Sequence, residues 1–140
     1  LEGSLRGGTE RGDAEMMRSM LEALSDFLGI PVGRLDTGNS TAMELAPSSA
    51  GIRDLTGATD GTLSLLILSK HTDQAACIQA LDTAVRRLTQ TRTLPAGDCW
   101  QMYAADTSTQ TNYIAKDGDY WIYSCIISVR FISKEGFINA

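Results

Sequence analysis

The clearest hydrophobic pattern in this chain is a regular alternation over residues 120–131. Every second residue from Trp121 to Phe131 is apolar, and the positions between them include two serines and Arg130. This period of two predicts a β-strand with one buried face and one mixed face. At about 3.4 Å per residue, the strand would be roughly 40 Å long and would cross a whole compact domain. We therefore expect partner strands along its full length, from this chain or from a neighbouring copy.

Two other segments have the period of an amphipathic helix. Between residues 14 and 28 the large apolar side chains fall on one stripe, and Gly29 is a typical residue at which a helix ends. A second helix is expected to start after Thr72 or Asp73, because either side chain can cap a helix N-terminus. Its buried face is predicted to hold the apolar residues within 77–88.

Shorter runs predict the remaining strands. They lie at 41–46, 62–69, 98–105 and 111–116. Residues 62–69 are apolar on both faces, which is typical of a central strand that is covered on both sides. Asp117-Gly118 predicts a type I′ turn that joins the last two strands as a hairpin.

Polar and glycine-rich stretches predict two loops, at 48–61 and 106–110. The first is longer than most connections in compact domains, so it is either functional or partly disordered. The second is expected to separate the strands at 98–105 and 111–116.

Taken in order, the elements predict an α+β fold with the sequence α-β-β-α-β-β-β. Its architecture would be a two-layer sandwich, in which two helices cover one face of a mixed, mostly antiparallel sheet. The helix between two strands suggests a crossover connection. One domain is expected over residues 16–134, with a disordered tail at 1–15 that resembles a cloning remnant and a short tail at 135–140.

The overall charge limits the classes of partner. A net charge of −5 over 140 residues disfavours nucleic acid and anionic membrane surfaces, since both attract basic proteins. Nor does any apolar run approach the ~20 residues of a membrane-spanning helix. Cys77, Cys99, Cys125 and the single His71 are too widely spaced for a zinc motif. The cysteines are instead interpreted as small buried hydrophobes of a reducing, cytosolic protein.

Motifs for catalysis are absent from the sequence. It contains no nucleophile elbow, phosphate-binding loop or dinucleotide fingerprint. His71 precedes a helix, where a cap or surface role is typical. The nearest carboxylate pairs, Asp54 with Asp60 and Asp117 with Asp119, lack the dense oxygen ligands of a calcium loop. We therefore expect no enzymatic activity, no metal and no cofactor.

Aromatic and charged side chains on the predicted elements are the remaining candidates for function. Exposed Tyr with Arg nearby is typical of protein interfaces. The candidate interface residues are Arg53, Asp54, Arg86, Arg87, Tyr103, Tyr113, Tyr120 and Arg130.

Three segments resemble a known protein family. Residues 65–70 (LLILSK), the helix at 73–82 and the hairpin at 117–123 are similar to minor capsid or tail-terminator proteins of long-tailed bacteriophages, and the element pattern extends the resemblance over 14–134. The resemblance implies a homo-oligomeric ring, commonly a hexamer, that ends the tail tube and joins tail to head. Its partners would be the tail tube protein and head-completion proteins. The protein would be part of a phage or prophage virion, assembled in the bacterial cytoplasm.

Two alternatives remain open. The chain could be a small α+β ligand-binding or enzymatic domain that uses the 48–61 loop and His71, which requires a pocket containing His71 and an acid. It could also be a bacterial accessory domain that binds a partner by adding an edge strand.

Overall fold

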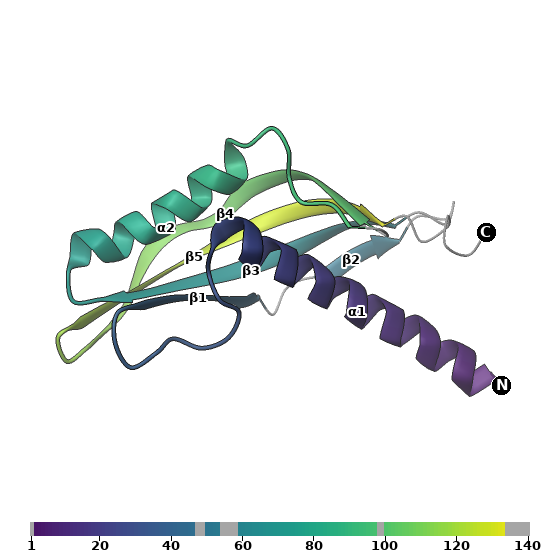
Figure 1. Ribbon diagram of the computed structural model, residues 1–140, viewed down its shortest axis with the longest axis horizontal. Coiled ribbons are helices and arrows are strands. Elements are labelled where there is room, and N and C mark those ends of the chain that lie inside the picture. The colour runs from purple at the N-terminus through teal and green to yellow at the C-terminus, as the bar shows by residue number, and fades with distance from the viewer. Residues whose placement is uncertain (1, 47–49, 54–58, 98–99, 134–140) are drawn as a thin grey trace.

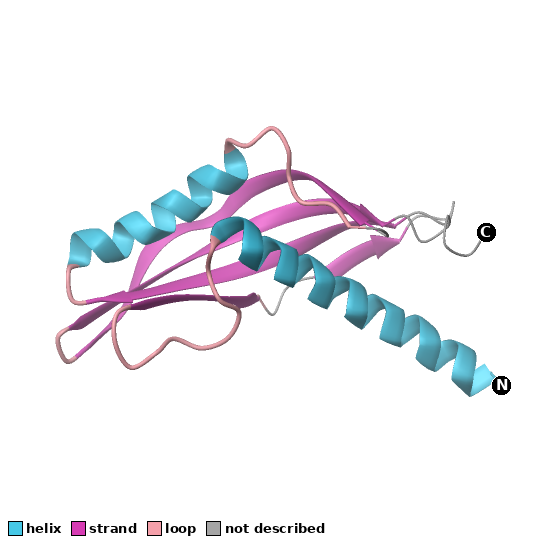
Figure 2. Cartoon of the chain, viewed as in Figure 1, coloured by secondary structure: helices cyan, strands magenta, loops and turns pink. Residues whose placement is uncertain are grey.

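The computed structural model describes residues 2–46, 50–53, 59–97 and 100–133 (Figure 1). The elements are α1 (Glu2–Leu28), β1 (Ser40–Leu45), β2 (Ala50–Arg53), β3 (Thr59–His71), α2 (Gln74–Thr89), β4 (Trp100–Asp117) and β5 (Tyr120–Ser133). Figure 2 shows the strands forming one sheet, with the two helices outside it. The α+β class is therefore confirmed. The observed order matches the predicted order approximately, with one strand more before α2 and one fewer after it.

The sheet has the strand order β1-β3-β5-β4, and β2 pairs with the first residues of β3 beside β1. All of these strand pairs are antiparallel, and parallel pairing occurs as an isolated bridge between Val32 and Met43. Because β5 lies between β3 and β4, α2 crosses over it, as the sequence predicts. The chain itself supplies both neighbours of β5 along its whole length, so no second copy is needed to pair it.

One face of the sheet carries the hydrophobic core. Ile67 and Cys125 are cross-strand neighbours on β3 and β5, both fully buried. Both helices pack on this face: Leu24 of α1 and Leu81 of α2 belong to the same buried cluster, and the indole Nε1 of Trp100 donates to Ser19 on α1. The apolar face of the strands and the apolar stripes of the two helices therefore form one core layer.

The 48–61 loop prediction is wrong where the structure describes this region. β2 and the start of β3 form antiparallel pairs here, with Gly51 opposite Gly61. Glycines give no hydrophobic alternation, so this strand pair leaves no period-two signal. The fold leaves no room for a side chain at Gly61, because an added Cβ would lie 2.5 Å from the Cζ atom of Phe131. The ring of Phe131 therefore packs directly on the backbone of β3.

The predicted loop at 106–110 is also wrong, because β4 continues through it as one strand of 18 residues. Two threonines in this stretch favour extended backbone, and β4 is an edge strand whose side chains here are exposed, so polar residues are tolerated. Four register shifts relative to β5 absorb the extra residues as bulges. Bulged edge strands resist pairing with other chains, which disfavours edge-strand addition at β4.

The hairpin turn differs in type from the prediction. Its two central residues are Gly118 and Asp119, because Asp117 pairs with Tyr120. Gly118 has a φ of 61°, whereas no described residue other than glycine has positive φ. A type I′ turn requires positive φ at both central residues, and glycine at the first one alone is the pattern of type II′.

α1 is longer than its amphipathic stripe predicts. The helix begins at Glu2, so residues 2–14 are helical, although the sequence predicts a disordered tail there. Once residues 15–28 are held against the sheet, each further turn adds backbone hydrogen bonds without a new nucleation step. In Figure 1 the N-terminal end of α1 projects beyond the sheet. The predicted tail at 135–140 lies outside the described residues.

Candidate protein interface

His71 has a local structural role at the start of α2. Its Nδ1 atom accepts a hydrogen bond from the backbone N–H of Asp73 at 2.9 Å. The Asp73 carboxylate in turn accepts from the backbone N–H of Ala75 at 3.2 Å, as an N-cap does. The strand pair that replaces the predicted 48–61 loop lies at the other end of the 13-residue β3, roughly 40 Å away. One pocket cannot contain both, which argues against the ligand-binding alternative.

The cysteines that the structure describes are buried. The Cys77 thiol donates to the carbonyl oxygens of Ser69 and Trp121 at 3.1 and 3.3 Å. Burial, with a smaller effect from Asp82, raises the pKa of the Cys125 thiol to about 11, so it is a neutral thiol at physiological pH. Cys99 lies outside the described residues.

The described part of the chain offers neither a metal site nor a membrane-spanning helix. Across those residues, no group of three His, Cys, Asp or Glu side chains could hold a metal ion. Of the helices described, neither is long and apolar enough to cross a membrane.

The predicted interface residues do not form one surface, although some of them lie close together. Asp54 lies outside the described residues, and Arg53 ends β2. Arg86 is exposed in the last turn of α2. Arg87 is used inside the chain: its guanidinium lies 5.7 Å from the ring centroid of Phe27 and donates to the carbonyl of Leu28. It therefore joins α2 to α1.

Tyr103 and Arg130 do meet, on neighbouring strands β4 and β5. The Arg130 guanidinium lies 5.6 Å from the centroid of the Tyr103 ring. Arg130 belongs to the sheet face opposite the helices, which we call the open face. Leu66, Leu68 and Ile126 also point there and are only partly buried, although the sequence predicts that 62–69 is covered on both sides.

The end of the β4–β5 hairpin carries an aromatic cluster. The Tyr113 ring meets those of Trp121 and Tyr123 edge to face, with centroids 6.2 and 5.8 Å apart. The Tyr123 hydroxyl accepts from the Gln74 side chain at 2.7 Å, which connects the cluster to α2. Lys116 lies over the Trp121 ring, its ammonium 4.5 Å from the centroid. Tyr113 is thus held rigidly although half of it is exposed.

Tyr120 belongs to the same end of the hairpin but is held separately. The Lys70 ammonium from β3 lies 4.8 Å from its ring centroid. Lys70 also donates to the carbonyl of Asp36 in the connection before β1. Tyr120 therefore helps to fix the end of the sheet.

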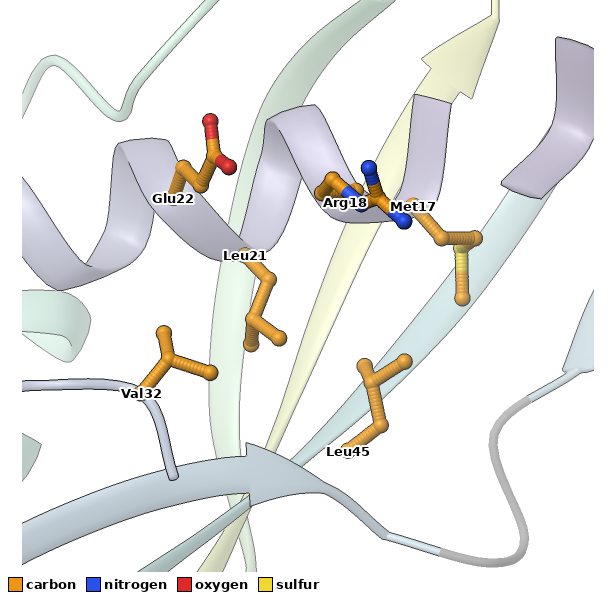
Figure 3. Close-up of a pocket in the computed structure, with 6 residues that line it drawn as sticks. All are labelled: Met17, Arg18, Leu21, Glu22, Val32 and Leu45. Carbon is orange, nitrogen blue, oxygen red and sulfur yellow. The ribbon is translucent and has the colours of Figure 1, made fainter. Parts of the chain in front are cut away.

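A groove between α1 and β1 is a surface that sequence reasoning missed. It has a volume of about 510 Å³ and is lined by Met17, Arg18, Leu21, Glu22, Val32 and Leu45. In Figure 3, Leu21, Val32 and Leu45 point towards a common space, whereas the Glu22 carboxylate points away from it. Its lining comes from three separate segments, so no local motif could have predicted it.

Comparisons with known proteins give a likeness of fold. No family model matches the sequence, and no curated protein matches it. Among solved structures, a chain from "Virion of native gene transfer agent (GTA) particle" matches with a TM-score of 0.55 and 16% identity. The match covers 84% of this chain and 91% of that one. The two chains share a fold. Since the match covers most of both chains, the likeness concerns the domain and not a short common fragment.

Proposed function

We propose that this chain is a structural protein of a phage or prophage virion, which forms a homo-oligomeric ring that terminates the tail tube and joins tail to head. The observation that carries the proposal is the shared fold with a virion chain, which extends over most of both chains. The resemblance of residues 65–70, 73–82 and 117–123 to tail-terminator proteins points the same way.

The surfaces of the domain support an assembly role. Exposed aromatic side chains are typical anchors of protein interfaces, and the hairpin end presents Tyr113 on a rigid support. A second apolar surface, the groove beside α1, lies at the other edge of the sheet. Two different contact surfaces on one chain are what a closed ring requires. The other partners in the proposal are the tail tube protein and head-completion proteins.

Deleting the gene from its phage or prophage tests the role in tail termination. A tube without a terminating ring has no cap to stop its growth and no joint to the head. We therefore expect electron micrographs of induced lysates to show tubes of variable, excess length beside heads without tails. Re-expression of the full chain should restore joined particles. Normal virions in the deletion strain would contradict the proposal.

A further inference from the structure

Tyr113 and Ile114 are consecutive exposed apolar residues of β4, close to the hairpin turn, and we call this pair the projection. Their side chains are 53% and 50% exposed, more than those of Val32, Tyr103 and Ile132 at 43–44%. The register shift between Tyr113 and Ala115 places Ile114 at a bulge. At a bulge, side chains no longer alternate regularly between the two faces of the sheet. Because the Tyr113 ring is already held by its two aromatic neighbours, little side-chain freedom would be lost when the projection is buried.

The groove between α1 and β1 fits such a projection in size and chemistry. Its volume of about 510 Å³ falls within the range of pockets that bury a small ligand, so one or two large side chains can enter. Apolar side chains of α1, β1 and Val32 line its interior (Figure 3). Val32 itself is 44% exposed, so the groove has apolar surface that the described residues leave uncovered.

The positions of the two surfaces determine how they can meet. β1 and β4 are the two outer strands in the order β1-β3-β5-β4, so the groove and the projection lie at opposite edges of one sheet. Contact between unlike surfaces at opposite edges is heterologous, and repeating it generates a ring if the rotation closes.

Exposed side chains of both charges lie beside each of the two surfaces. The groove is flanked by Arg18 and Glu22 on α1, and the projection is followed by Lys116 and Asp117. All four side chains are exposed. Each surface therefore offers one cation and one anion to the other, which favours a defined orientation over sliding contact.

We propose that Tyr113 and Ile114 of one copy insert into the α1–β1 groove of a second copy, and that this contact joins neighbouring subunits. The inference rests on the proposed ring function and names the surfaces that build the ring. The occupant of the groove is thus this same chain, and not a small ligand or a different protein.

The variant Ile114→Glu tests the contact, with Ile132→Glu as its matched control. Ile132 is a similarly exposed isoleucine on β5, outside both surfaces. Native mass spectrometry over a concentration series, with and without tail tubes of the encoding phage, measures assembly. We expect Ile114→Glu to need at least about tenfold more protein to assemble, because a buried carboxylate opposes the contact. The control should stay within about threefold of the wild type.

A cysteine pair tests the same contact directly. In the variant Val32→Cys/Ile114→Cys, oxidation should produce a ladder of covalent oligomers, because the two positions meet between copies. The control pair Val32→Cys/Ile132→Cys should stay largely monomeric on denaturing gels.

The possible results separate the inference from the proposed function. If the wild type assembles and Ile114→Glu assembles equally well, the inference is overturned while the ring remains. If Ile132→Glu alone weakens assembly, the contact lies near the open face and the inference is equally overturned. If the wild type assembles neither alone nor with tail tubes, and the cysteine pair gives no ladder, both the ring and this contact are wrong.

Discussion

Replacing Ile127 with Ala is expected to lower the free energy of unfolding by about 2–5 kcal/mol, which is a large part of the stability of a domain of this size. Ile127 is 0% exposed on β5 and lies opposite Leu65, which is also fully buried. Truncation removes buried apolar surface and leaves a cavity that a sheet covered by two helices cannot fill by collapse. Urea denaturation followed by circular dichroism measures the change.

Ile126 is the matched control for this prediction. It is the same residue type one position earlier and points to the open face, where it is only partly buried. Ile126→Ala should therefore cost about 1 kcal/mol or less. Equal losses at both positions would contradict an arrangement in which the isolated chain buries only one face of the sheet.

Replacing Gly61 with Ala is the second change with a large expected effect. The added Cβ would lie 2.5 Å from Cζ of Phe131, closer than two carbon atoms can approach, and Phe131 is only 2% exposed. The ring or the β3 backbone must move, so the free energy of unfolding should fall by about 1–3 kcal/mol or more. Thermal unfolding monitored by circular dichroism should show a correspondingly lower midpoint.

Two further variants identify the cause of that loss. Gly38→Ala should be nearly neutral, because an added Cβ there meets nothing within 4 Å. The double variant Gly61→Ala/Phe131→Leu should lose less unfolding free energy than the two single variants together, since leucine leaves room for the added Cβ. Strict additivity would show that contact with the ring is not the source of the loss.

The sequence predicted the elements whose signal is local and periodic. Alternation from Trp121 to Phe131 predicted the buried face of β5, and all six of its apolar positions lie on the helix side of the sheet. Asp73 was predicted as a possible cap of α2 and is its N-cap. Both signals depend on neighbours within a few residues along the chain.

The local sequence pattern predicts the wrong structure where tertiary contacts decide the conformation. β2 pairs glycine with glycine, and β4 runs through the polar stretch 106–110 because β5 supplies a continuous partner. Residue type alone predicts Arg87 as an interface residue, whereas in the fold its side chain joins α2 to α1. Ile114 and Val32 were missed, because their exposure follows from a bulge and from a groove between distant segments.

The most direct test of the central claim is electron microscopy of the purified full chain mixed with tail tubes of the phage or prophage that encodes it. We expect a single ring of copies at one end of each tube, and the same ring mass by native mass spectrometry. Bare tube ends, together with a protein that stays monomeric at every concentration tested, would contradict the proposed function.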